Sequence, residues 1–129
     1  MTRMEYALLV IRVLWQLARY DLINATYGFE RIHRHLAQRR VSSRQFHPET
    51  EARVCEAVAL AACFYYKPAL CLERSVVAAL LLRQYGISGR LVIGYRPAPF
   101  FSHAWVEVDG RVVNDSPAYK ERLQVLCTA

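Results

Sequence analysis

Three residues in the second half of the chain have the side-chain types needed for acyl transfer through a thiol: Cys71, His103 and Asp115. A thiol nucleophile needs a base that takes its proton, and the base needs an acid that holds it in the right tautomer. The three residues occur in that order along the chain, so they form a candidate Cys-His-Asp triad. In this hypothesis Cys71 is the nucleophile, His103 the base and Asp115 the orienting acid.

Cys71 stands at the start of the most apolar segment, residues 71–85, which is predicted to form a central helix ending at Gly86. Unpaired N–H groups at the start of a helix stabilise a thiolate, and Arg74 adds to this effect while Glu73 opposes it. The backbone N–H of Cys71 would be one donor to an oxyanion, and the sequence places no second donor. The other cysteines are interpreted as small core residues: Cys55, Cys63 and Cys127.

Two different periodicities divide the chain into a helical part and a strand-forming part. Apolar residues recur at spacings of three and four in the first part, which predicts helices over residues 3–22, 29–38 and 48–66. They alternate with polar residues in the last part, which predicts strands over residues 90–96, 103–108 and 111–115. The fold class is therefore α+β, with N-terminal helices and a central cysteine-bearing helix packed on a small antiparallel sheet. One domain is expected over residues 1–129, divided into a helical part (1–67) and the catalytic helix and sheet (68–129).

The turn at Asp109 and Gly110 decides whether His103 and Asp115 share a face of the sheet. A two-residue loop would place Asp115 on the wrong face, whereas a three-residue loop with Gly110 in a bulge pairs His103 with Asp115. We predict the bulge. Two further cross-strand pairs follow from this register: Trp105 with Val113, and Glu107 with Arg111.

The composition excludes several classes of protein. The 129 residues are 54% hydrophobic and 22% charged, which rules out a disordered chain. The cysteines show no CxxC or zinc-finger spacing, so we expect neither a metal nor a cofactor. The apolar N-terminal stretch is interrupted by Arg3, Arg12 and Arg19, so we expect neither a membrane span nor a signal peptide. We therefore expect a cytoplasmic protein whose thiols are reduced.

The net charge of +6 is concentrated partly in a basic segment over residues 31–44. The segment contains two histidines and several arginines: Arg31, His33, Arg34, His35, Arg39 and Arg40. No aromatic residues alternate with these arginines, as they would in a protein that binds single-stranded nucleic acid, so we do not expect nucleic acid as a partner. We interpret the segment as a solvated helix face, and the alternative is a surface that meets an acidic peptide or a partner protein.

Three strings carry a family resemblance: CLERSVVAALLLRQYG, LVIGYR and FFSHAWVEVDGRVVND. Together they resemble the transglutaminase-like cysteine proteases of lasso-peptide biosynthesis over about residues 68 to 117. The resemblance implies a transglutaminase-like or papain-like fold, with Cys71, His103 and Asp115 as nucleophile, base and third triad member. It also implies that the enzyme removes the leader peptide from a ribosomally made precursor, before a separate cyclase closes the ring.

Members of this family commonly carry an N-terminal leader-recognition domain, for which this chain has no room. The resemblance therefore implies the protease half of a split system, with a small separate recognition protein as partner and the first three helices as the docking region, including Trp15, Tyr65 and Tyr66. Two alternatives stay open: an acyl transferase that uses an amine in place of water on the same fold, and a non-catalytic peptide-binding adaptor.

Overall fold

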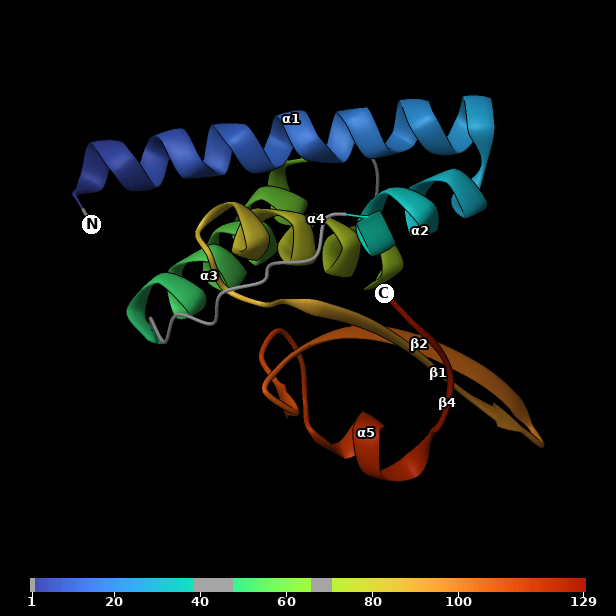
Figure 1. Cartoon of the computed structure of the whole chain (residues 1–129). Coiled ribbons are helices and arrows are strands. Elements are labelled where there is room, and N and C mark those ends of the chain that lie inside the picture. The colour runs from blue at the N-terminus through green and yellow to red at the C-terminus, as the bar shows by residue number, and fades with distance from the viewer. Residues whose placement is uncertain (1, 39–47, 66–70) are drawn as a thin grey trace.

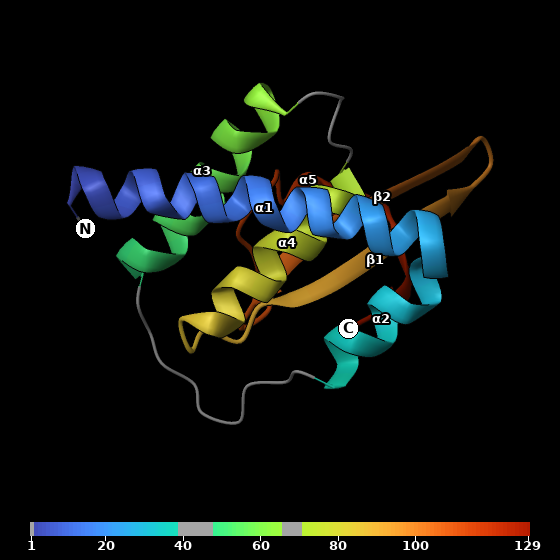
Figure 2. The same ribbon diagram turned by 90° about the horizontal axis from the view of Figure 1, so that it is seen from above.

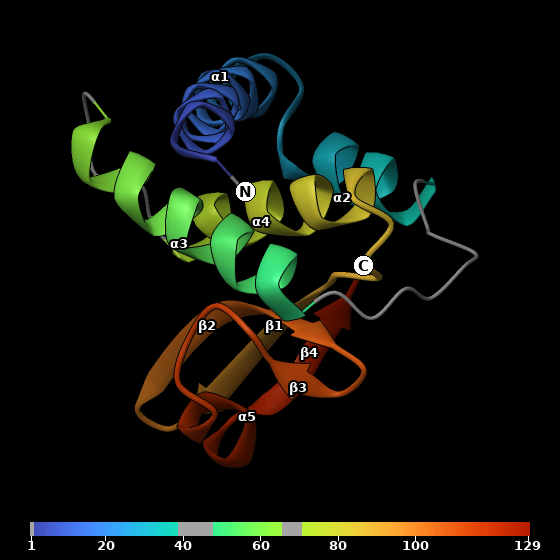
Figure 3. The same ribbon diagram turned by 90° about the vertical axis from the view of Figure 1, so that its left-hand side faces the viewer.

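The chain folds into helices that cover one face of a small antiparallel sheet, with a short helix on the other face (Figures 1 and 3). The structure is a computed structural model and describes residues 2–38, 48–65 and 71–129. The helices are α1 (Arg3–Tyr27), α2 (Phe29–Gln38), α3 (Pro48–Phe64), α4 (Cys71–Gln84) and α5 (Ala118–Arg122). The strands are β1 (Arg90–Pro97), β2 (Phe100–Val108), β3 (Arg111–Val112) and β4 (Gln124–Thr128). The α+β class predicted from the two periodicities is confirmed.

Helix α1 is longer than predicted and lies across the other helices of its layer (Figure 2). Thr2 and Glu5 form a capping box at its start, because each side chain accepts a hydrogen bond from the backbone N–H of the other. The helix runs to Tyr27 instead of ending near residue 22. It ends where Gly28 adopts a φ of 80°, a left-handed conformation that costs little only for glycine.

Helix α4 forms the centre of the core, as its uniformly apolar sequence predicts. Val77, Ala78 and Leu81 are fully buried, and the helix contacts both α1 and α3 on one side and strand β2 on the other. Apolar residues all around a helix are stable only when every side of it is covered, so the sequence of α4 fixes it between layers. Cys71 is therefore held at the start of the buried central helix.

The sheet has four antiparallel strands in the order β3-β2-β1-β4. The sequence predicted three strands, and both β4 and helix α5 were missed. Helix α5 has only five residues, too few for a periodicity to show, and most of the β4 side chains are exposed, so they do not alternate. The missed elements matter because α5 covers the face of the sheet that carries His103.

Successive residues of β2 contribute to opposite faces of the sheet. Ala104 and Val106 belong to the main core together with α4. Trp105 points to the other face, where it forms a second small core with Val92 and Leu123. His103 lies two residues before Trp105 and shares its face.

The predicted bulge between β2 and β3 is wrong. Val108 pairs with Arg111 and Glu107 with Val112, which is the register of a two-residue loop. Asp109 and Gly110 have φ values of 52° and 78°, as in a type I′ turn whose twist matches that of the flanking strands. The predicted pairs of Trp105 with Val113 and Glu107 with Arg111 therefore do not form.

The charged residues of this hairpin find other partners. Arg111 forms an ion pair with Glu51 of α3 at 3.3 Å, while the buried Glu107 accepts hydrogen bonds from Lys120 of α5 at 3.2 Å and from the Trp105 indole at 2.8 Å. These contacts tie both α3 and α5 to the hairpin.

Candidate active site

His103 and Asp115 form a close pair beside the middle of β2. The Nε2 atom of His103 lies 2.7 Å from Oδ2 of Asp115, with 13% and 29% of the two side chains exposed. The backbone N–H of Ser116 donates to the second carboxylate oxygen at 2.8 Å. Because the carboxylate is held at both oxygens, it fixes the tautomer of the imidazole and leaves Nδ1 as the ring nitrogen that can accept a proton.

Aromatic rings fix the plane of the imidazole. The ring of Tyr119 in α5 stacks on His103 with 3.9 Å between centroids and 26° between planes. The ring centroids of Phe101 and Trp105 lie 6.2 Å and 6.4 Å away. Tyr119 was not singled out from the sequence, because a tyrosine in a five-residue helix carries no periodic or motif signal.

Asp115 reaches His103 although the hairpin has the two-residue loop, which was expected to place Asp115 on the opposite face of the sheet. The sheet ladder continues for one bond beyond β3, from the Val113 N–H to the Val106 carbonyl at 3.0 Å, and then stops. The next ladder position is taken by the side chain of Asn114, whose Oδ1 accepts from the Val106 N–H at 2.8 Å. The chain bends away from the sheet at this point, so Asp115 is no longer bound to the alternation of a strand.

Asn114 and Ser75 connect this bend to the helix that carries Cys71. The Asn114 amide donates to the Ser75 hydroxyl at 3.1 Å, and that hydroxyl donates to the Ala104 carbonyl at 3.2 Å. Ser75 is buried and lies one helical turn after Cys71, so the two share a face of α4. One buried network therefore joins the neighbour of Asp115, the neighbour of His103 and the helix of Cys71.

The structure brings together two of the three predicted residues. Cys71 is half-buried at the first position of α4, which packs on the Ala104 face of the sheet, whereas His103 lies on the Trp105 face. Within the described part of the chain, the thiol of Cys71 makes no hydrogen bond to His103 or Asp115. Its helix is fixed against β2 by the hydrogen bond from the Ser75 hydroxyl to the carbonyl of Ala104, the residue after His103.

Tyr20 of α1 lies on the other side of Cys71 and was not singled out from the sequence. It is buried, and its pKa is raised to about 12 by burial and by the negative charges of Glu73, Asp21 and Cys71, in that order. Its hydroxyl therefore keeps its proton to a higher pH than that of an exposed tyrosine. Glu73, two residues after Cys71, is itself buried.

The strand beside His103 has a glycine, Gly94, at a position where a side chain would not fit. It pairs with His103 across the sheet, and a Cβ at this position would lie 2.6 Å from Cη2 of Trp105 and 2.9 Å from Cβ of Leu123. The Trp105 ring lies directly over the glycine. The flat surface beside the imidazole therefore depends on the absence of a side chain there.

The remaining cysteines differ more than the sequence predicted. Burial, with the charge of Glu51, raises the pKa of Cys55 to about 12, and burial also raises the pKa of Cys127. Cys63 was interpreted as a core residue, and this is wrong, because its side chain is exposed on α3. Its thiol donates to the Ala59 carbonyl one turn earlier.

No group of three or more metal-ligating side chains occurs among residues 2–38, 48–65 and 71–129. Over the same ranges, no helix is long and apolar enough to cross a membrane.

Comparison with known proteins decides the family of the chain. The family model described as the transglutaminase-like superfamily matches residues 11–128, which is nearly the whole chain. The chain belongs to the transglutaminase-like superfamily. The match includes α1 from residue 11 onward, α2 and α3, as well as the elements that carry Cys71, His103 and Asp115.

A curated relative narrows the comparison. The chain is 45% identical over 56 residues to the microcin J25-processing protein McjB of Escherichia coli. The match covers 43% of this chain and only 27% of the length of that relative. No solved structure matches the chain significantly.

Proposed function

We propose that this transglutaminase-like protein is a cysteine peptidase that removes the leader from a ribosomally made lasso-peptide precursor. The proposal rests on one observation, the imidazole–carboxylate pair of His103 and Asp115 at 2.7 Å in a chain that also starts its buried central helix with Cys71. The similarity to a microcin-processing protein supports a precursor peptide as substrate. We place the reaction in the cytoplasm, where a nucleophilic thiol stays reduced.

In the proposed reaction, Nδ1 of His103 takes the proton of Cys71 while Asp115 holds Nε2 and stabilises the imidazolium. The thiolate attacks the carbonyl carbon of the scissile peptide bond, and the imidazolium gives its proton to the leaving amine. A thioester between Cys71 and the leader remains, and water hydrolyses it with His103 as base. The backbone N–H of Cys71, at the start of α4, donates to the oxyanion that forms in each step.

Cleavage of the full-length precursor tests the proposal directly. The wild-type protein, supplied with a recognition protein encoded beside it, should release leader and core peptides whose masses sum to that of the precursor plus one water. Cys71→Ala should release neither, whereas Cys63→Ala, which removes an exposed thiol on α3, should act like the wild type. Leader peptide joined through its C-terminal carbonyl group to an amine would instead indicate a transferase, and binding without any cleavage would indicate an adaptor.

A partner is supported by the outer face of α1. Met4, Leu8, Ile11, Trp15 and Leu22 are between 55% and 75% exposed, and the exposed Ala18 completes the series. Their spacing of alternating fours and threes is the heptad spacing of a helix that packs on another helix. Figures 1 and 3 show α1 at the outer edge of the helical layer, so one side of this helix faces away from the rest of the molecule. We propose that a helix of the recognition protein binds here.

Tyr65, another predicted docking residue, is not part of this exposed surface. Tyr65 is half-buried and its hydroxyl donates to Asp21, while Tyr66 lies outside the described residues. Trp15 is thus the aromatic residue through which the docking can be tested.

Charge substitution on α1 separates docking from catalysis. Trp15→Glu should abolish the stimulation of precursor cleavage by the recognition protein, and cleavage by the chain alone at high substrate concentration should not change. Phe64→Glu is a matched control, because Phe64 is 73% exposed on α3 and lies outside the heptad series. If Trp15→Glu responds to the recognition protein as the wild type does, α1 is not the docking surface.

A further inference from the structure

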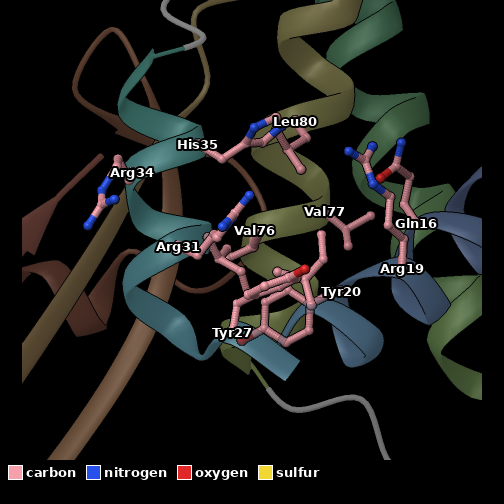
Figure 4. Close-up of a pocket in the computed structure, with 12 residues that line it drawn as sticks. Gln16, Arg19, Tyr20, Tyr27, Arg31, Arg34, His35, Val76, Val77 and Leu80 are labelled. Atoms are coloured by element: carbon pink, nitrogen blue, oxygen red, sulfur yellow. The ribbon is translucent and has the colours of Figure 1, made fainter. Parts of the chain in front are cut away.

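A cavity of about 540 Å³ lies between α1, α2 and α4, on the side of α4 that faces away from the sheet (Figure 4). Val76, Val77 and Leu80 of α4 line it together with aliphatic residues of the other two helices. No step of the proposed reaction uses this space.

The described residues that line the cavity include three arginines and a histidine, and none of them is acidic. Arg31 and His35 project from α2 toward α4, Arg19 lies on the α1 side, and Arg34 points outward (Figure 4). The guanidinium of Arg31 stacks over the ring of Tyr27 at 4.4 Å, which holds it at the rim. The cavity therefore has an apolar floor and positive charge on two sides.

The basic segment over residues 31–44 is more than the solvated helix face that its composition predicted. Arg31 and His35 form part of the cavity wall, and only Arg34 points outward as a solvated residue does. Arg39 and Arg40 lie outside the described residues.

Arg19 joins this cavity to the exposed apolar series on α1. It follows Trp15 by four residues and precedes Leu22 by three, so it lies at the edge of that series. Arg12 occupies the same edge one heptad earlier, and its guanidinium donates to the hydroxyl of Tyr85 at 3.3 Å. Both arginines are exposed. One edge of the apolar series is therefore basic and continues into the cavity wall.

The acidic residues of α1 do not neutralise this edge. Glu5 lies at its far end, where its carboxylate accepts the Thr2 N–H in the capping box. Asp21 lies on the opposite edge of the series, where it accepts the hydrogen bond of Tyr65. The charges beside Arg19 are thus those of the other cationic residues that line the cavity.

This arrangement selects the kind of helix that fits on α1. An apolar stripe covers the exposed series, and acidic residues along one edge of the stripe complement the arginines. A carboxylate accepts paired hydrogen bonds from a guanidinium, and the methylene groups that carry it can contact the aliphatic floor of the cavity. A second copy of the chain has a net charge of +6, so an acidic partner fits this edge better.

We infer that α1 and the cavity together bind an amphipathic helix of a partner protein whose acidic edge lies along Arg12 and Arg19, with one acidic side chain in the cavity. The inference rests on the proposed docking of a recognition protein on α1 and adds the charge of the partner. It does not depend on Cys71 or on cleavage, so it is tested by binding alone.

A designed helical peptide is the probe. The apolar series from Met4 to Leu22 extends over about 27 Å, so a helix of about 20 residues covers it. The probe has leucine at the positions that face α1, glutamate at both edges of this stripe and alanine elsewhere. Its uncharged match has glutamine in place of every glutamate. Each peptide carries a fluorophore and is kept at trace concentration while the full chain is titrated, and fluorescence anisotropy measures the affinity.

The glutamate peptide should bind at least about fivefold more tightly than the glutamine peptide. Raising the salt from about 0.05 M to about 0.5 M should remove most of this difference, because salt screens the charges. Equal affinities, or tighter binding of the glutamine peptide, would overturn the inference. If neither peptide bound, the inference and the docking surface on α1 would both be wrong, whereas precursor cleavage that requires Cys71 would still support the peptidase.

Arginine variants locate the effect. Arg19→Gln combined with Arg31→Gln should remove the preference for glutamate, whereas Arg90→Gln, which changes an exposed arginine at the start of β1, should keep it. Circular dichroism reports whether the double variant is folded. If it fails to fold, each single variant is measured in its place, and each should weaken the preference. A preference that these variants leave unchanged would overturn the inference.

The recognition protein and a second copy are compared in the same way. Binding of the recognition protein should weaken at least about fivefold in the arginine variants, and unchanged binding would overturn the inference. A dimer of the chain that Trp15→Glu dissociates, seen by sedimentation, would show that α1 pairs with itself and would also overturn it. Charge-dependent binding of the recognition protein without any cleavage would keep the inference and exclude the proposed peptidase.

Discussion

Asp115 acts on His103 through a contact between two side chains that are only partly exposed. Asp115→Asn keeps the size of the side chain but offers an amide that no longer stabilises the imidazolium and can stabilise the wrong tautomer. We expect turnover of the precursor to fall by roughly two to four orders of magnitude, by analogy with the effect of such a change on other triads. Steady-state kinetics measures this, with circular dichroism as the check on folding, and turnover within twofold of wild type would exclude Asp115 from the triad.

Two buried groups make stability depend on alkaline pH. The pKa of Cys55 is raised to about 12 from 9.0, and that of Tyr20 to about 12 from 10.0, in both cases mainly by burial. The folded state therefore holds these protons more tightly than the unfolded state, so their contribution to stability is complete below about pH 9 and is lost as the pH rises toward about 12.

Urea denaturation from about pH 8 to about pH 10.5 measures this loss. The free energy of unfolding should decrease over the range, and the decrease should be shallower in Cys55→Ala, which lacks one of the two groups. A free energy of unfolding that stayed constant over the range would mean that neither group is buried as described.

The packing of β1 against β2 beside the active site depends on Gly94. Gly94→Ala would place a Cβ 2.6 Å from the Trp105 ring, and that ring is fully buried with nowhere to move. We expect a loss of stability of about 1–3 kcal/mol from overpacking. A lower thermal midpoint measures it, and Trp105→Leu in the same chain should recover part of the loss introduced by the alanine.

The bend after β3 depends on the side chain of Asn114. Asn114→Ala removes the acceptor for the Val106 N–H and the donor to Ser75, so the segment that carries Asp115 loses its attachment to both β2 and α4. We expect kcat to fall with little change in KM, because the imidazole loses its orienting partner while the substrate surface remains. Asn114→Asp keeps the acceptor and should recover part of kcat. A change in KM alone would show that Asn114 does not position Asp115.

The helices and the strands were predicted from the sequence to different degrees, for a physical reason. The bounds of α2 and the start of α4 follow from periodicity and caps, because these signals are local in the chain. The register of the hairpin depends on the conformation of Asp109, which takes a positive φ that the sequence allows but does not require. A one-residue difference of this kind changes every pair in the hairpin.

The candidate site, too, was predicted only as far as local sequence signals reach. The types of Cys71, His103 and Asp115 and the order in which they occur were enough to select them. The contact between His103 and Asp115 was expected from strand pairing, and it forms instead through a bend held by Asn114. Long-range partners such as Tyr20, Ser75 and Tyr119 leave no pattern in the sequence, since only the fold brings them to the site.

At the level of the whole molecule, α1 has apolar residues on two opposite sides. Leu9, Val13 and Leu17 are buried in the core, while the heptad series on the outer side is exposed. An α-helix with two apolar sides is stable in water only when both are covered, which accounts for the proposed recognition protein.

The central claim is that Cys71 and His103 act together, and the pH dependence of thiol alkylation tests it most directly. The reactive species is the thiolate, and an ordinary thiol forms it only near and above about pH 8.5. Cys63→Ser removes the exposed competing thiol, and peptide mapping after iodoacetamide treatment follows Cys71 in the full chain. We expect Cys71 to be still alkylated at about pH 6, and His103→Ala to lower this rate at least about tenfold relative to the rate at about pH 9. Identical pH profiles with and without His103 would contradict it.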